Sequence, residues 1–134
     1  MIIDGKNAVL GRLASLSAKA LLKGEEVKIV NAEKVIMIGD PRGIVVDFLK
    51  KREIGSPHHG PFYPKKPDLI VRRSIRGMLP YKTNKGRAAF KKLKVYIGMP
   101  KELEKIKMEK IAQKRVHTKF ITIGEIAESL GWRE

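Results

Sequence analysis

The chain has 134 residues, a net charge of +15 at pH 7, 43% hydrophobic residues and no cysteine. This length suits one domain with its own core, and the apolar content excludes a wholly disordered basic tail. The absence of cysteine excludes disulfides and thiolate metal sites. No apolar run approaches the roughly 20 residues needed to cross a bilayer. We therefore expect a soluble, intracellular protein.

The first part of the sequence predicts strands and helices in alternation. The expected elements are a strand over residues 2–4, a helix over 8–23, strands over 27–31 and 35–38, and a helix from Pro41 to near Gly55. Asn7 is the expected N-cap of the first helix, and Gly24 suits the left-handed position that ends it. Asp40 caps the second helix. Because a helix joins the first two strands, they are expected to pair in parallel, as in an α/β protein.

Between Glu53 and Glu102 the sequence is strongly basic. Residues 54–101 hold twelve Lys or Arg and a single acid, Asp68. The segments on either side are close to charge balance. The residues before this block include ten Lys or Arg and seven Asp or Glu, and those after it include seven and six. A charge excess confined to one region points to a polyanionic partner.

A proline-rich segment, residues 56–67, opens the basic block and is expected to form an extended surface loop. It places two histidines, Phe62 and Tyr63 beside Lys65 and Lys66. These flat groups suit stacking on exposed bases or a groove in folded RNA. The alternative is that the two aromatic rings only pin the loop to the core. A metal site at His58 and His59 is disfavoured, because adjacent histidines rarely converge on one ion.

Two basic helices are predicted after this loop. The first runs from a capping Asp68 to about Leu79, before Pro80, with an apolar face of Leu69, Ile75, Met78 and Leu79. The second covers about residues 85–93 and leads into a fourth strand over 94–97. Residues 101–119 have no clear assignment. A capping box at Thr122 and Glu125 opens a last helix through Leu130, expected as an appendage to a core complete by Ile97.

The charge spacing on these helices favours phosphate binding. Arg72 and Arg76 are four residues apart, as are Arg87 and Lys91, so like charges stack on one face at a cost of a few tenths of a kcal/mol per pair. Neutralisation by phosphate explains this better than a solvated surface does. A membrane partner is disfavoured, because the helices lack a broad apolar face opposite the charge.

Catalysis is not indicated by the sequence. The first glycines, Gly5 and Gly11, fit neither the dinucleotide fingerprint nor the phosphate-binding loop. Asp4, Asp40 and Asp47 have no evident partner base, and no nucleophile lies at a spacing that would join it to one. We therefore expect no enzyme activity, no cofactor, no metal and no small-molecule substrate.

Several stretches resemble the universal L-thirteen family of large-subunit ribosomal proteins. They are residues 4–15, 30–34, Arg73-Ser-Ile-Arg-Gly-Met-Leu-Pro80, 85–87 and 93–96, and the resemblance covers Ile2 to about Pro100. The loop at 56–67 and the C-terminal Thr-Ile-Gly-Glu helix resemble its archaeal and eukaryotic branch. The resemblance implies a three-layer α/β/α domain with a small parallel sheet of about four strands, no chemistry of its own, and a cytoplasmic place in the large ribosomal subunit.

The resemblance also implies the partners: large-subunit ribosomal RNA and neighbouring ribosomal proteins, with a role in subunit assembly and translation. The RNA-binding residues carried over are Arg72, Arg73, Arg76, Gly77, Lys82, Lys85, Arg87 and Lys91, with Lys65, Lys66, His58 and His59 from the loop. Gly77 is expected to let the backbone come close to RNA or to turn the chain sharply, and the alternative is that it simply ends a helix. We expect residues 1–100, including the basic elements at 56–94, to form the RNA-binding core and 101–134 a C-terminal extension. Alternatives are a messenger-RNA-binding regulator acting away from the ribosome and a nucleotide-dependent enzyme.

Overall fold

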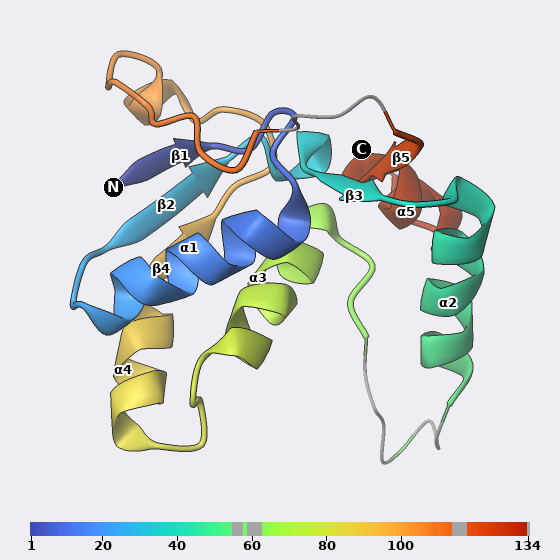
Figure 1. The fold of residues 1–134 in the computed structure, drawn as a ribbon, viewed down its shortest axis with the longest axis horizontal. Helices are drawn as coiled ribbons and strands as arrows, with labels where there is room; N and C mark the ends of the chain where they lie inside the picture. Colours follow the sequence, from blue (N-terminus) through green and yellow to red (C-terminus); the bar gives the residue numbers. More distant parts are fainter. Residues whose placement is uncertain (55–57, 59–62, 114–117, 134) are drawn as a thin grey trace.

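A computed structural model describes residues 1–54, 58, 63–113 and 118–133. The chain begins with β1 (Ile2–Asp4), α1 (Leu10–Leu22) and β2 (Val27–Val30), and β2 lies parallel to β1 with Ile3 opposite Ile29. The parallel crossover is therefore confirmed (Figure 1). Gly24 has a φ of +94° and ends α1 in the left-handed region, as predicted.

The start of α1 differs from the prediction. Val9, not Asn7, is the N-cap, and Asn7 itself has a φ of +61°. The two residues after Asn7 are held outside the helix by backbone hydrogen bonds to other segments. The carbonyl of Ala8 accepts from the N–H of Ile36 at 2.9 Å, and the N–H of Val9 donates to the carbonyl of Ala112 at 2.8 Å.

Three strands, not four, form the parallel sheet. β4 (Leu93–Val95) joins the free side of β2 in parallel, giving the order β1-β2-β4. β3 (Ile36–Ile38) follows β2 after only a short 3-10 helix, η1 (Ala32–Lys34), whereas a parallel neighbour needs a crossover of about a dozen residues or more. It pairs instead with β5 (Phe120–Thr122) as an antiparallel ribbon. The expected α/β class is confirmed.

The central helices are α2 (Pro41–Glu53), α3 (Pro67–Met78) and α4 (Asn84–Lys91). Asp40 is the N-cap of α2 as predicted, but Asp68 does not cap α3. Lys66 occupies that position, because the fixed φ of Pro67 suits the first helical residue. Helix α3 packs beside α1 and against β4, and α1 also contacts α4, so these three helices form one packed layer.

The buried face of α3 also differs from the prediction. Val71, Ile75 and Leu79, spaced four residues apart, are buried, as is Ile70. The two predicted core residues Leu69 and Met78 are 41% and 46% exposed. Apolar residues four positions apart lie on one side of a helix and can pack together against one neighbouring layer. Leu69 does not lie in this row.

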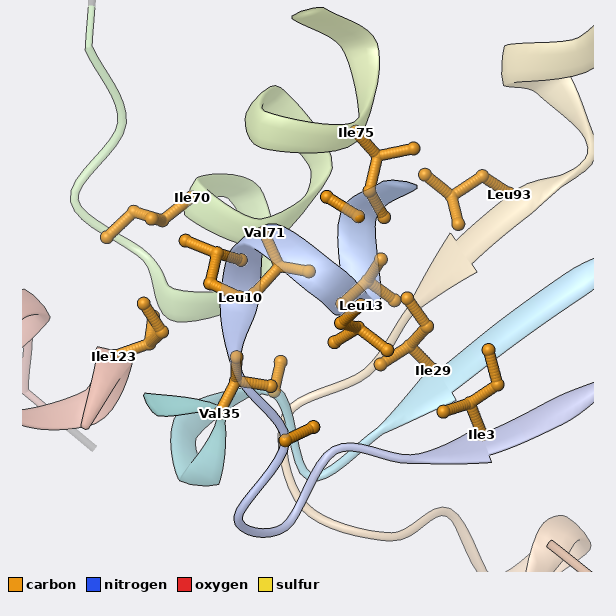
Figure 2. Close-up of a cluster of buried hydrophobic side chains, with 14 of the residues drawn as sticks. Ile3, Leu10, Leu13, Ile29, Val35, Ile70, Val71, Ile75, Leu93 and Ile123 are labelled. Atoms are coloured by element: carbon orange, nitrogen blue, oxygen red, sulfur yellow. The ribbon is translucent and has the colours of Figure 1, made fainter. Parts of the chain in front are cut away.

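The C-terminal segment belongs to the core. Glu109 exchanges backbone hydrogen bonds with Ile2 and Asp4 at 2.8 and 3.0 Å and so covers the edge of β1. Helix α5 (Ile123–Ser129) begins with the predicted capping box. Its residues Ile123 and Ile126 are fully buried in the same cluster as α1, α3 and the sheet, and Figure 2 shows Ile123 within that cluster. The expectation of an appendage to a core complete by Ile97 is wrong. In the described part of the chain no helix is long and apolar enough to cross a membrane.

Candidate nucleic-acid interface

Three arginines of α3 each lie over an aromatic ring. The guanidinium carbon is 4.6 Å from the ring centre of Phe90 for Arg72, 4.2 Å from Tyr63 for Arg73, and 4.7 Å from Tyr81 for Arg76. All three distances fall within the roughly 6 Å range of a favourable cation–π contact. We call these three side chains the arginine cluster.

The rings hold the arginine cluster in place without closing it off from solvent. All three arginines are half-buried, and together with Pro64, Leu69 and Phe90 they line a hollow of about 280 Å³. A ring under the flat face of a guanidinium does not cover the N–H groups at its edge, and such groups match phosphate oxygens in a fork geometry. The cluster is therefore pre-ordered for an anion, because fewer rotamers are lost on binding.

The angle between α3 and α4 is fixed by the turn between them. The carbonyl of Pro80 accepts from the hydroxyl of Thr83 at 2.7 Å and from its N–H at 3.0 Å. The same hydroxyl accepts from the N–H of Gly86 at 3.2 Å and caps α4. A Cβ on Gly86 would lie only 1.8 Å from the Pro80 carbonyl oxygen. Only glycine allows this close approach, which sets the basic side chains of α4 relative to the arginine cluster.

The other predicted contact residues surround the arginine cluster in sequence and are exposed. Those on the surface of α4, on the turn before it and on the segment before α3 are Lys85, Arg87 and Lys91, then Lys82, then Lys65 and Lys66. His58 is exposed, whereas His59 lies outside the described residues. Phe62 also lies outside them. Tyr63 is half-buried beneath Arg73, so its ring supports a cation of the candidate interface.

Gly77 lies in the last turn of α3 and does not turn the chain. It is exposed, and a Cβ at this position would meet no atom within 4 Å. A sharp turn at Gly77 is thus wrong, while the open backbone beside Arg73 and Arg76 fits the predicted close approach of a partner.

Sequence reasoning missed two groups of residues. Lys51, in the last turn of α2, lines a cavity together with Tyr63 and Arg73. A run of three bases at residues 50–52 was the available signal, but Glu53 separates it from the basic block. The supporting rings Tyr81 and Phe90 were also missed. These rings lie on other segments than the arginines they support. The residue spacing within one helix therefore cannot predict which ring lies under which arginine.

Two of the remaining polar groups serve the fold. Lys92 donates from its Nζ to the carbonyl of Gly24 at 3.2 Å, at the end of α1. Asp4 accepts at Oδ1 from the N–H of Lys6 and from Nδ2 of Asn31, both at 3.0 Å, which ties the ends of β1 and β2 together. Among the described residues no group of three or more His, Cys, Asp or Glu is placed to hold a metal ion.

Comparison with known proteins identifies the family. Residues 1–102 match the family model described as ribosomal protein L13. The chain is 48% identical to the large ribosomal subunit protein uL13 of Methanopyrus kandleri, over 98% of this chain and 87% of the relative. It is 48% identical to that of Methanocaldococcus jannaschii and 44% identical to that of Methanosarcina barkeri, over 97% of this chain and 96% of each relative. These are archaeal proteins, in line with the branch that the sequence resembles. The chain belongs to the ribosomal protein L13 family.

Proposed function

We propose that this chain is a structural constituent of the large ribosomal subunit that binds ribosomal RNA, supports assembly of the subunit and acts without catalysis. The observation that carries the proposal is the arginine cluster, in which three cations of one helix are each held on a ring and line one hollow. Family membership supplies the ribosomal context. As part of a ribosome the protein would act in the cytoplasm.

The binding mechanism is electrostatic clamping by a rigid frame. The arginine cluster and the exposed bases of α4 stand at a fixed angle because Gly86 seats α4 against Pro80. The segment at 63–66, which leads into α3, adds the exposed Lys65 and Lys66. Each phosphate contact releases condensed counterions, so several contacts on one frame give strong, salt-dependent binding. A frame of this kind favours a folded RNA whose phosphates already have the matching spacing.

The RNA-binding part of the chain is assigned to residues 1–100 and a separate role to residues 101–134. All the proposed RNA contacts lie between His58 and Lys91. The segment at 101–119 carries mixed charges, which suits a neighbouring ribosomal protein better than a phosphate backbone. The division concerns function, since α5 is part of the common core.

The slope of log affinity against log salt tests this proposal. Replacement of Arg72, Arg73 and Arg76 by Ala should lower the slope for large-subunit RNA by about two to three, because each phosphate contact contributes roughly 0.7 to 0.9. A control variant removes three exposed cations outside the proposed interface, Lys19, Lys23 and Lys34. It should change the slope by less than one. Equal effects of the two variants would mean that net charge alone drives binding.

Sedimentation separates the ribosomal role from regulation of messenger RNA. The native protein should travel with large subunits at low and moderate salt. A protein that stays in a free pool at low salt would contradict the ribosomal assignment and favour the regulatory one.

A further inference from the structure

A second cavity lies between α2 and α3, next to the arginine cluster. Its volume is about 230 Å³, and its lining residues come from α2, from the segment before α3 and from α3 itself. They are Phe48, Lys51, Tyr63, Pro64, Ile70, Arg73, Ser74 and Gly77. Figure 1 shows α2 standing apart from the packed layer of α1 and α3, with the segment that leads into α3 running between them.

The walls of this cavity are flat groups, each paired with a cation. The ammonium of Lys51 lies 5.2 Å from the ring centre of Phe48, and the guanidinium of Arg73 lies 4.2 Å from that of Tyr63. Ile70, only 4% exposed, supplies an apolar surface. Aromatic rings and guanidinium planes are the surfaces on which proteins stack unpaired bases.

The size of the cavity limits the occupant. Pockets that bury drug-sized molecules measure roughly 300–1,000 Å³, so a cavity of about 230 Å³ takes one ring system and not a whole nucleotide. Pro64 and Arg73 also line the neighbouring hollow of the arginine cluster. A ring held in the cavity would therefore have its sugar and phosphate beside Arg72 and Arg76.

Two further residues suit the approach of a base. The Ser74 hydroxyl donates to the carbonyl of Ile70 at 3.2 Å, which leaves its oxygen lone pairs to accept from a base N–H. Gly77 lines the cavity and is exposed, and a Cβ added there would meet no atom outside the local helix backbone within 4 Å.

We infer that this cavity, which we call the base pocket, receives one unpaired base of the bound RNA while Arg72 and Arg76 hold its phosphate. The inference rests on the proposed RNA-binding function and adds the kind of RNA feature that the protein reads. A base carries a negatively charged backbone with it, which complements Lys51 and Arg73. An apolar side chain from a neighbouring protein would fill the same space but would cover the ammonium of Lys51 without supplying a counter-charge.

Model RNA duplexes that differ at one nucleotide test the base pocket on the full-length protein. The probes are a duplex with a single bulged adenosine, the same duplex with an abasic bulge, and the fully paired duplex. The native chain should bind the adenosine bulge about 5- to 160-fold more tightly than the abasic bulge, which is the range expected for stacking of one base. A 2-aminopurine in the bulge should lose fluorescence on binding, because it stacks.

Two glycine variants provide a matched pair. Gly77→Leu places a side chain at the mouth of the base pocket, whereas Gly11→Leu places the same side chain at an exposed position of α1 where an added Cβ also meets nothing within 4 Å. Both should fold, and circular dichroism checks this. Gly77→Leu should bring the preference for the adenosine bulge close to one, while Gly11→Leu should keep it. Phe48→Ala should also reduce it.

The possible outcomes separate the base pocket from the proposed function. Salt-dependent binding by the native chain with no preference for the adenosine bulge overturns the base pocket and leaves RNA binding intact. Equal loss of preference in Gly77→Leu and Gly11→Leu also overturns it. Full preference in Gly77→Leu, with failure of that variant to enter large subunits, would assign the cavity to a neighbouring protein. Absence of any salt-dependent RNA binding would contradict the proposed function itself.

Discussion

One methyl group should change stability in opposite directions at Gly86 and Gly77. A Cβ on Gly86 would lie 1.8 Å from the carbonyl oxygen of Pro80, 2.2 Å from its carbonyl carbon and 2.8 Å from the backbone nitrogen of Tyr81. These are backbone atoms, so α4 or the turn before it must move. Overpacking typically costs about 1–3 kcal/mol and occasionally more, and contacts this short place Gly86→Ala at the upper end.

The same change at Gly77 meets no neighbour within 4 Å. Alanine is favoured over glycine in a helix by about 0.5–1 kcal/mol, so Gly77→Ala should be slightly more stable than the native chain. Urea unfolding of the two variants, followed by circular dichroism, should therefore give free energies of unfolding that differ by about 2–4 kcal/mol. Values within about 0.5 kcal/mol of each other would refute the close seating of α4 on Pro80 and the fixed angle derived from it.

Three further stability predictions follow from burial and capping, each checked by the same urea unfolding. Leu13→Ala should cost about 2–5 kcal/mol through a core cavity, whereas Leu16→Ala, at a residue 42% exposed, should stay within about 0.5 kcal/mol of the native chain; equal losses would contradict the orientation of α1. Ile126→Ala should lower the free energy of unfolding by about 2–5 kcal/mol, because that side chain is fully buried. A loss of only a few tenths of a kcal/mol would mean that α5 is an appendage after all. Thr122→Ala removes the acceptor for the N–H of Glu125 and should cost about 0.5–2 kcal/mol; an unchanged stability would show that the capping box adds nothing.

Local patterns predicted much of the fold. The alternation of apolar runs placed β1, β2 and α1, the pair Asp40-Pro41 marked the start of α2, and Thr122 with Glu125 marked the start of α5. Each of these signals lies within a few residues of the feature it predicts. Propensity, capping and periodicity act over that range, so the sequence carries them directly.

Long-range pairing was not predictable in the same way. The partner of β3 is β5, which follows more than eighty residues later in the sequence. Neither three-residue strand has a residue pattern that identifies the other as its partner. The burial of Ile123 and Ile126 likewise depends on a surface built by α3 and η1, which the C-terminal segment reaches only in the folded chain. For this reason the sequence predicted a core that is complete by Ile97, whereas the folded core also includes Ile123 and Ile126.

The candidate site also combines local features, which the sequence predicts, with long-range contacts, which it does not. Clustering of Arg72, Arg73 and Arg76 on one helix is a local feature and was predicted, although their RNA contacts stay a prediction. Their rings come from the segment before α3, from the turn after it and from α4. Charge counting identifies the cations but not the rings that order them, since an aromatic residue near a basic helix is as often part of the core.

The most direct test of the central claim is a map of protein–RNA crosslinks on intact large subunits that contain this chain. We expect crosslinks to ribosomal RNA between His58 and Lys91, centred on α3 and the first turn of α4, and few from the exposed Lys19 and Lys23 of α1. Subunits that hold the protein but give RNA crosslinks only outside residues 58–91 would contradict the proposed interface.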